Sequence, residues 1–372
     1  MANKQLDNNF QCVADVLTTQ QRLAAQLSRA WQGRGALAQV LRPVSWAYGG
    51  LVCLRRQMFA VGLLKAWHAQ VPVIVVGNVV AGGAGKTPLV MAMVMHLKAQ
   101  GLQVGVVSRG YGRNTLLASL AGVAEVLPST PAAYSGDEPL LIKRATGVAV
   151  FVGVDRVQAA QALLAAYPHT QCIVSDDGLQ HYALGRCLEV AVFDDRGIGN
   201  GWLLPAGPLR EPWPARRRAG IDLVLHTGQT PAFEGYRASR RLADYAINRF
   251  GETVPLNSLQ STGQHVAALA ATANPSAFFS MLQQRGLVLS QTLALPDHFD
   301  FANFDALGLM ASTLGHSENL ITVLCTEKDA VKLFALPIQA RVNVLAVPLE
   351  FSPEAAFWNA LDDLLKPVLQ RK

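Results

Sequence analysis

Short runs of β-branched and other apolar residues alternate along much of this chain with stretches whose apolar residues recur at helical spacing. Such runs predict buried parallel strands, because both faces of such a strand must be apolar. The stretches 88–101 and 155–168 predict helices. The alternation therefore predicts a mostly parallel sheet with helices on both faces. The predicted strands begin at Val71 and continue at Leu102–Gly110, Gly147–Gly153, Gln171–Asp177, Leu188–Asp195 and Ile221–Gly228.

A second α/β pattern follows a polar, arginine-containing stretch. Residues 231–263 contain the sequence YRASRRLADYAINRF and are expected to form a connector. A strand-like run, a helix from Pro275 to Gly286 and three further strand-like runs come after it. We therefore expect an N-terminal extension over residues 1–70, a main domain over 71–230 and a smaller α/β domain over 264–372.

Composition and charge narrow the class of protein. The chain has 372 residues, of which 51% are hydrophobic and 16% charged, so it is globular and long enough for two domains. Its five cysteines have no metal-ligand spacing and suit a reducing compartment. Residues 1–70 hold eight basic and two acidic side chains, a net +6 that equals the net charge of the whole chain. No secretory signal is visible.

The basic N-terminal segment is also apolar. The run Pro43–Leu54 lies between Arg42 and the pair Arg55-Arg56, and twelve residues are too few to cross a bilayer, which takes about 20. These features favour a helical segment lying on an anionic membrane. A core-packing helix with exposed arginines is the alternative. Arginines interleaved with leucine, valine and tryptophan do not form the basic face expected for nucleic-acid binding.

A glycine-rich loop follows the first strand and ends in Gly85-Lys86-Thr87. Strand, loop and helix together form a phosphate cradle, in which backbone N–H groups and the helix N-terminus face an anion and a lysine reaches the outer phosphates. Thr87 is placed to meet Mg²⁺. The usual pattern has glycine where this chain has Val80, and an ordinary glycine-rich turn is the alternative. The predicted ATP-binding residues are Val80, Ala81, Gly82, Gly83, Ala84, Gly85, Lys86 and Thr87.

Polar motifs recur where the predicted strands end, which is the edge where open parallel sheets bind ligands. Asp176 and Asp177 follow an apolar strand, and either a metal-binding carboxylate or a helix cap fits this position. Asp137 could accept the proton of an attacking hydroxyl, or it could cap a helix whose first turn holds Glu138. His298 is a lone histidine, which by itself indicates no function.

The stretch 196–212 is a long loop rich in glycine and proline, with apolar residues between Arg196 and Arg210. Exposed loops are seldom this apolar without a ligand or a membrane contact. Such a loop suits an amphiphilic substrate that carries a phosphate. A packed Ω-loop is the alternative.

Eight motifs together resemble one family. In chain order they are NVVAGGAGKTP, SRGYGR, GDEP, VDR, DDGLQH, GNGWLLPAGPLREP, PDHF and TEKDAVKL, between about residues 40 and 335. This set resembles the tetraacyldisaccharide 4′-kinases, the lipid A 4′-kinases of Gram-negative bacteria. The family shares the valine in the loop. The resemblance implies a P-loop NTPase-like α/β/α sandwich with a smaller α/β domain, and the two domains would close over the nucleotide.

The resemblance also implies a reaction. The enzyme would use ATP and Mg²⁺ to phosphorylate the 4′-hydroxyl of tetraacyldisaccharide 1-phosphate, giving lipid IVA at the cytoplasmic face of the inner membrane. Asp137 would be the base and His298 its partner across the domain cleft. The residues implied to bind metal are Thr87, Glu138 and Asp176, and those implied to bind substrate are Arg156, Asp177, Gln180, His181, Asn200 and Arg210.

Three other functions compete with this one. A membrane-associated P-loop ATPase switch would carry an extra lysine early in the loop, where this chain has Val80-Ala81. A GTPase would show an N/T-K-x-D motif, and in Thr326-Glu327-Lys328-Asp329 the lysine stands one place late. A kinase for another sugar would leave the basic apolar N-terminus without a purpose. No nucleic-acid or protein partner is expected.

Overall fold

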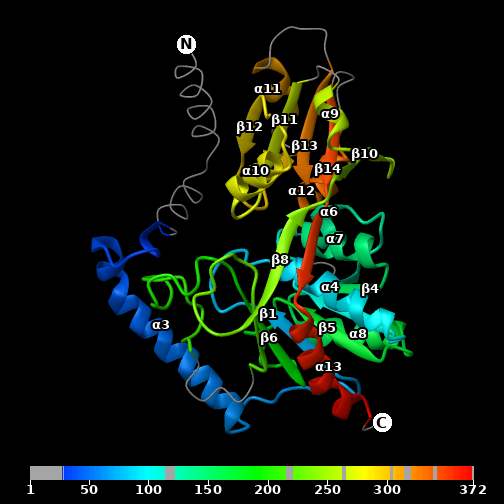
Figure 1. The fold of residues 1–372 in the computed structure, drawn as a ribbon. Helices are drawn as coiled ribbons and strands as arrows, with labels where there is room; N and C mark the ends of the chain where they lie inside the picture. Colours follow the sequence, from blue (N-terminus) through cyan, green and yellow to red (C-terminus); the bar gives the residue numbers. More distant parts are fainter. Residues whose placement is uncertain are drawn as a thin grey trace.

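The computed structural model describes residue 27 and residues 29–113, 122–214, 221–261, 265–301, 305–313, 320–337 and 342–370. Residues 1–26 of the expected N-terminal extension lie outside this part of the chain. Two sheets organise the described residues (Figure 1). We call the nine-stranded sheet and its helices the large-sheet unit, and the six-stranded sheet and its helices the small-sheet unit.

The large sheet has the strand order β15-β8-β7-β6-β1-β5-β2-β4-β3. All of its described pairings are parallel except those of β3 and β15, which pair antiparallel at the two edges. The six strands predicted between residues 71 and 228 are present. The strands are β1 (Val73–Gly77), β2 (Val104–Ser108), β3 (Val123–Glu125), β4 (Ala149–Gly153), β5 (Cys172–Asp176), β6 (Leu188–Phe193), β7 (Leu223–His226), β8 (Tyr236–Leu242) and β15 (Leu349–Pro353).

Helices cover both faces of this sheet, as the apolar runs predict. Because side chains alternate along a strand, Ile74 and Val76 of β1 enter one core while Val73 and Val75 enter another. The first core contains residues of helices α4 (Lys86–Ala99), α7 (Asp137–Thr146) and α13 (Ala355–Leu369). The second contains residues of α8 (Arg156–Ala166). The short helix α6 (Ala132–Ser135) precedes α7. The predicted α/β/α sandwich is confirmed.

The small sheet has the order β10-β9-β14-β13-β11-β12, with parallel pairing among its last four strands. Its two faces are also both covered: Phe278 and Leu282 pack on one side, and Ala330 and Leu333 on the other. The elements are β9 (Tyr245–Ile247), β10 (Thr253–Pro255), α9 (Ser258–Ser261), β11 (His265–Ala270), α10 (Pro275–Gln284), β12 (Gln291–Ala294), α11 (Ala306–Thr313), β13 (Ile321–Thr326), α12 (Glu327–Leu333) and β14 (Val342–Val347).

The chain passes between the two units through two antiparallel strands. β8 leads from the large sheet into β9, and β14 leads back into β15, which pairs with β8 from Leu349↔Leu242 to Pro353↔Ala238. Figure 1 shows this ribbon running between the units. The residues of the expected connector, 231–263, therefore carry three strands. The residues after 348 return to the large sheet.

The composition of β8 explains why this stretch was expected to be a connector. β8 has only Ala238 and Leu242 buried, because it lies near the sheet edge and its other side chains reach solvent. A strand with arginines at its exposed positions lacks the continuous apolar run by which the other strands were predicted. Helix α13 then returns to the large sheet because its apolar face, which includes Phe357, Leu361 and Leu365, completes the first core.

Helix α3 (Ala36–Ala60) lies along the side of the large-sheet unit (Figure 1). Its buried residues are Ala38 and Ser45, and the Ser45 hydroxyl donates to the Leu203 carbonyl at 2.8 Å. The Tyr48 hydroxyl donates to the Arg210 carbonyl at 3.0 Å. The helix thus contacts the loop that precedes β7, and near its C-terminal end the Phe59 ring centroid lies 5.8 Å from that of Tyr182, after β5.

We expect Leu361 and Leu364, two of the leucines of α13, to differ sharply in their contribution to stability. Leu361 is fully buried and Leu364 is 40% exposed on the same helix. Leu361→Ala should lower the free energy of unfolding by about 2–5 kcal/mol, because it removes core contacts and leaves a cavity. Leu364→Ala should change it by about 0.5 kcal/mol or less. Urea unfolding followed by circular dichroism measures both, and equal effects would contradict this placement of α13.

Candidate active site

The predicted phosphate loop lies between β1 and α4, at the carboxyl edge of the large sheet. Gly85 caps α4 with a φ of 82°, a left-handed conformation that favours glycine. A Cβ atom at Gly85 would also lie 3.2 Å from the Thr227 methyl group. The last residue of the loop before α4 therefore packs closely against Thr227, just after β7, and the N-terminus of α4 directly follows the loop, as in an anion-binding site.

Lys86 is held at the start of α4 by buried polar partners. Its Nζ donates to Asn78 Oδ1 at 3.2 Å and lies 3.6 Å from Asp177 Oδ1. Asn78 is fully buried and donates to the Gly82 carbonyl at 2.9 Å, which ties the lysine to the loop backbone. The ammonium group is thus fixed where a P-loop lysine meets phosphates.

The first residues of the loop pair with the segment before β7. Val80 and Leu209 form an antiparallel bridge, and the Ala81 N–H donates to the Pro208 carbonyl at 2.8 Å. The backbone of Val80 is therefore paired as in a strand and does not have a left-handed φ. A β-branched residue consequently fits at the position where the usual pattern has glycine. Because the Ala81 amide is already engaged, the amides that can face a phosphate lie between Gly82 and Thr87.

Asp176 ends β5 beside this loop and is 1% exposed. Ser108 Oγ donates to its Oδ2 at 3.2 Å, whereas its Oδ1 has no hydrogen-bond partner among the described residues. Burial, reinforced by the carboxylates of Glu138 and Asp177, raises the pKa of Asp176 to about 7. A buried carboxylate oxygen without a partner fits a cation. Together with Thr87 at the start of α4, these residues fit Mg²⁺.

An all-protein metal cage is not what this site offers. Among the described residues, no group of three or more His, Cys, Asp or Glu side chains is arranged so that it could hold a metal ion by itself. Magnesium in kinase sites is usually held by one or two carboxylates together with substrate phosphates and water. The donor set at Asp176 agrees with that second arrangement.

Asp177 lies among cations. Arg210 Nη1 donates to its Oδ1 at 3.2 Å, and Arg156 Nη2 donates to its backbone carbonyl at 3.2 Å. Burial favours the neutral acid, but Lys86 and Arg210 outweigh it and lower the pKa of Asp177. Asp177 has a φ of 49°, which turns the chain sharply after β5. Two guanidinium groups therefore gather beside the phosphate loop.

Gln180 and His181 lie on the same turn. Gln180 Nε2 donates to the Asn78 carbonyl at 3.2 Å, and Arg210 Nη1 donates to Gln180 Oε1 at 3.4 Å. His181 Nε2 lies 3.4 Å from Asp155 Oδ1. Burial, with the nearby Arg156 charge, lowers the pKa of His181 to about 4 and leaves its imidazole neutral near pH 7.

Asp137 and His298 meet across the two units, although 161 residues separate them. His298 Nδ1 lies 3.1 Å from both carboxylate oxygens of Asp137, which is 3% exposed at the start of α7. His298 stands in the loop after β12 with a φ of 59°. The geometry is that of a carboxylate and an imidazole joined by a hydrogen bond.

Two lysines that sequence reasoning missed complete this cluster. Lys328 Nζ donates to Asp297 Oδ1 at 2.8 Å and to Glu138 Oε1 at 3.2 Å. Lys332 Nζ donates to Asp137 Oδ2 at 3.2 Å. Both belong to the TEKDAVKL motif, where an i, i+4 spacing places them on one face of α12. That spacing was the available signal.

The charge state of Asp137 follows from these neighbours. Burial alone would raise the pKa of the Asp137 carboxyl. The hydrogen bond from His298 and the charges of Lys328 and Lys332 outweigh burial and hold that pKa well below its ordinary value. Asp137 is therefore a carboxylate at neutral pH.

A sequence model of the family described as tetraacyldisaccharide-1-P 4′-kinase matches residues 37–366. The chain belongs to the tetraacyldisaccharide 4′-kinase family. A tetraacyldisaccharide 4′-kinase of Polaromonas naphthalenivorans is 60% identical over 345 residues, covering 93% of this chain and 96% of the relative. One from another Polaromonas species is 59% identical, covering 92% of this chain and 97% of the relative.

A solved structure agrees with the family assignment. The crystal structure of an "apo" form of LpxK from Aquifex aeolicus in complex with ATP superposes with a TM-score of 0.72 at 28% identity, covering 90% of this chain and 99% of that one. The predictions of family, P-loop fold and kinase activity are confirmed. The protein is an ATP-using phosphotransferase of lipid A biosynthesis.

Asn200 is a predicted substrate residue of this kinase whose side chain makes three hydrogen bonds to the backbone. Its Nδ2 donates to the Gly33 carbonyl at 3.0 Å and to the Ala206 carbonyl at 2.9 Å, and its Oδ1 accepts from the Trp202 N–H at 3.0 Å. The geometry gives Asn200 the task of joining the loop 200–210 to the segment before α3.

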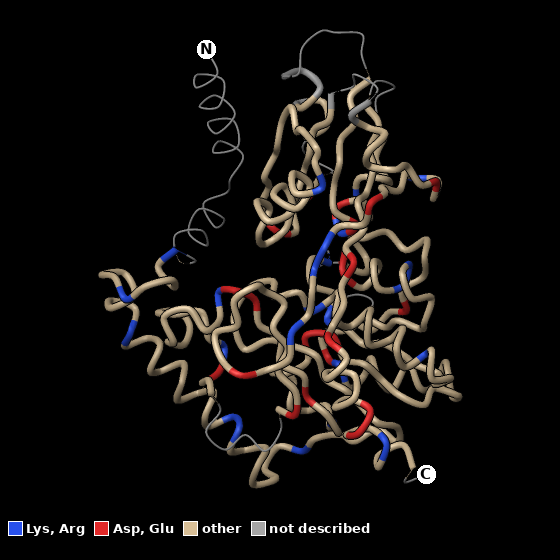
Figure 2. Tube along the Cα trace, in the orientation of Figure 1, with Lys and Arg blue, Asp and Glu red and all other residues tan. Residues whose placement is uncertain are grey.

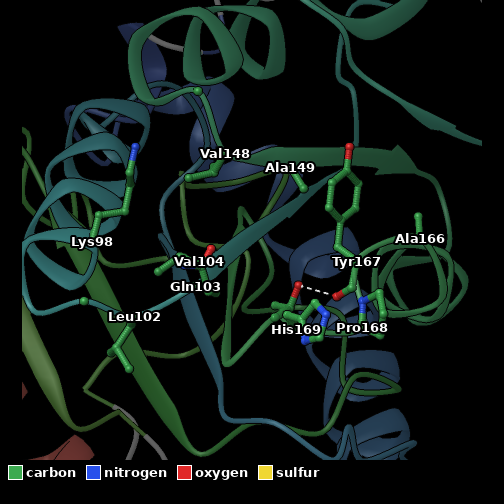
Figure 3. A pocket seen from close by; sticks show the side chains of 13 residues that line it. Lys98, Leu102, Gln103, Val104, Val148, Ala149, Ala166, Tyr167, Pro168 and His169 are labelled. Atoms are coloured by element: carbon green, nitrogen blue, oxygen red, sulfur yellow. Dashed lines mark hydrogen bonds between the residues drawn. The ribbon is translucent and has the colours of Figure 1, made fainter.

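A surface pocket lies at the opposite edge of the large sheet (Figure 3). Val104 at the start of β2, Ala149 at the start of β4, and the side chains of Lys98, Tyr167 and His169 line it. None of the predicted site residues of the kinase belongs to this lining. The chemistry gathers instead at the carboxyl ends of the strands, as open parallel sheets lead one to expect.

We expect the neighbouring carboxylates Asp176 and Asp177 to affect stability in opposite directions. The folded pKa of Asp176 is raised, so its contribution to stability is fully present below its unfolded pKa near 3.8 and is lost as the pH rises through about 7. Asp176→Asn should therefore raise the melting temperature of the metal-free, nucleotide-free protein at pH 8, but not at pH 4.

Asp177→Asn is the matched variant. The folded pKa of Asp177 is lowered, so its contribution is present above its unfolded pKa and is lost as the pH falls. This variant should lower the melting temperature at pH 8. Thermal unfolding at both pH values measures the two effects, and shifts of the same sign at pH 8 would contradict this electrostatic description.

Proposed function

We propose that this kinase transfers the γ-phosphate of Mg²⁺-bound ATP to the 4′-hydroxyl of tetraacyldisaccharide 1-phosphate, forming lipid IVA at the cytoplasmic face of the inner membrane. The observation that carries the assignment of roles is the Asp137–His298 pair at 3.1 Å. This pair supports Asp137 of the large-sheet unit as the proton acceptor, with His298 of the small-sheet unit as its hydrogen-bond partner. The phosphate loop and the carboxylates at the end of β5 supply the donor side of the reaction.

On the donor side, Lys86 and the amides from Gly82 to Thr87 hold the phosphates of ATP. The Lys86 ammonium exchanges its Asn78 and Asp177 partners for phosphate oxygens. Thr87, Asp176 and Glu138 are the residues that would hold Mg²⁺. When bound, the ion neutralises charge on the β- and γ-phosphates.

On the acceptor side, Asp137 accepts the proton of the 4′-hydroxyl. Phosphoryl transfer passes through a loose transition state, so the carboxylate mainly orients the hydroxyl and takes its proton as the bond to phosphorus forms. Because the Asp137 pKa is low, the carboxylate is ionised and ready to accept. His298 donates from Nδ1 and fixes the direction of the carboxylate.

The lipid head group lies against the turn after β5. Arg156 and Arg210 provide guanidinium groups for a phosphate, and such groups bind phosphate through paired hydrogen bonds. Gln180 and the neutral His181 can donate to or accept from sugar hydroxyls. Asp177 holds Arg210 in place. Asn200 is left out of this set, because its hydrogen bonds already serve the loop 200–210.

Helix α3 supports a peripheral contact with an anionic membrane. Its buried residues Ala38 and Ser45 lie on one side, and an apolar stripe recurs at helical spacing on the opposite side. The charged positions of the helix are all basic (Figure 2). No helix in the described part of the chain is both long and apolar enough to cross a bilayer. The stripe consists of Leu37, Val40, Val44, Leu51 and Leu54, 44% to 74% exposed.

Asp137→Asn should lower kcat by about 10²- to 10⁴-fold, because an amide cannot take the hydroxyl proton. The Kd for ATP should change by less than about threefold, since the donor site is elsewhere. Transfer of labelled phosphate from ATP to the disaccharide 1-phosphate lipid measures kcat. A variant that loses ATP binding yet keeps kcat at saturating ATP would refute the assignment of the base.

The triple variant Val40→Ser, Leu51→Ser, Leu54→Ser should lower co-sedimentation with phosphatidylglycerol-containing vesicles by about tenfold or more, because it removes three exposed apolar side chains from the stripe. Phe250→Ser with Val288→Ser is the control, since both side chains are nearly 80% exposed but lie in the small-sheet unit. Unchanged binding of the triple variant would exclude α3 as the membrane contact.

A further inference from the structure

Lys328 contacts side chains of both units, and the proposed reaction so far gives it no role. Its Nζ lies 2.8 Å from Asp297 Oδ1, 3.2 Å from Glu138 Oε1 and 3.3 Å from His298 Nε2. Asp137 Oδ2 lies 4.0 Å from the same atom. Burial would lower the pKa of Lys328, but these carboxylates outweigh burial and raise it above its ordinary value. Lys328 is therefore an ammonium ion held among three acids and an imidazole.

The two ring nitrogens of His298 face partners with opposite hydrogen-bonding requirements. An ammonium group has only donors, so Lys328 requires that Nε2 be an acceptor. The Asp137 carboxylate has only acceptors, so it requires that Nδ1 carry the proton. Both are met by one state, the neutral imidazole with its proton on Nδ1. The other partners of the ring are Asp297, whose Oδ1 lies 3.8 Å from Nε2, and the tilted ring of Tyr111.

Lys328 also lies where the units join. Its helix α12 has Ala330 and Leu333 in the core of the small-sheet unit, whereas Val331 packs in the core of the large-sheet unit. Asp297 and His298 belong to the small-sheet unit, and Glu138 belongs to α7 of the large-sheet unit. The lysine therefore fixes where the loop carrying His298 stands relative to α7.

We propose that Lys328 is a positioning residue for phosphoryl transfer: it holds His298 as the neutral Nδ1–H tautomer, so that this proton always points at Asp137. This inference rests on the proposed roles of Asp137 and His298. Lys328 touches neither substrate nor nucleotide in this scheme, and it acts through the ring. A tautomer with the proton on Nε2 would leave the Asp137 carboxylate facing a nitrogen lone pair.

Lys332 provides the matched comparison. It donates to Asp137 Oδ2 at 3.2 Å and to the Phe299 carbonyl at 2.9 Å, on the same helix. No hydrogen bond or ion pair joins it to the His298 ring among the described contacts. Loss of Lys332 removes a charge near Asp137 and leaves the constraint on Nε2 in place.

The test uses the full chain with ¹⁵N-labelled histidine, and the His298→Gln spectrum assigns the resonances of His298. At pH 7 the unmodified protein should show a protonated Nδ1 and an unprotonated Nε2. Lys328→Met should lose this pattern and give imidazolium or mixed tautomers. Lys328→Arg and Lys332→Met should keep it. An unchanged His298 spectrum in a folded Lys328→Met protein would overturn the proposal.

Kinetics give the second readout. Lys328→Met should lower kcat by about 10- to 100-fold, the loss typical when an outer partner that orients an active-site histidine is removed. The KM values for ATP and lipid should change by less than about threefold, and Lys328→Arg should restore most of kcat. Lys366→Met, on the exposed side of α13, is the control for a lysine lost at the surface.

The two readouts separate this proposal from the one on which it rests. If Lys328→Met changes the tautomer but kcat stays normal, Lys328 is not a positioning residue for the reaction. If His298→Gln itself keeps normal kcat, the role of His298 in the proposed function fails, while the spectra still show whether Lys328 sets the tautomer. A loss of kcat that Arg restores, together with the changed spectrum, supports both.

Discussion

The burial of one carboxylate, Asp137, is the constraint around which the active site is arranged. A buried carboxylate without partners costs several kcal/mol, so it persists only where donors and cations surround it. Its partners His298, Lys328 and Lys332 all come from the small-sheet unit. The Glu138 N–H of its own unit also donates to Asp137 at 3.0 Å, but the lysines that contact the carboxylate come from the other unit. The geometry of the proposed base therefore depends on the contact between the units.

A second set of contacts joins the proposed membrane helix to the nucleotide site. The segment 31–48 reaches the loop 200–210 through Asn200, Ser45 and Tyr48. That loop in turn pairs with Val80 and Ala81, and it places Arg210 on Asp177. The loop 200–210 thus connects α3 to the phosphate loop through hydrogen bonds on both sides. These contacts explain why a glycine- and proline-rich segment is so well packed.

Much of the large-sheet unit could be predicted from the sequence, because strands such as β1 and β5 are buried on both faces and appear as continuous apolar runs. The phosphate loop and Asp176 could be predicted because they directly follow such strands. β8 could not, because its exposed positions hold arginines, and the return of β15 and α13 to the large sheet depends on a long-range pairing that no local pattern encodes. Lys328 and Lys332 were not predicted as site residues, because two lysines on one face of a helix usually lie in solvent. Only the approach of α12 to α7 makes them part of the site.

The central claim is that Asp137 and His298 act as one unit across the two sheets. A double-mutant cycle on kcat tests it most directly, with Asp137→Asn, His298→Gln and the double variant measured at saturating ATP and lipid. If the residues act together, the double variant should be slower than the slower single variant by no more than about threefold, since losses within one functional unit do not add. Losses that multiply in the double variant would show that the two residues act independently and would contradict the account.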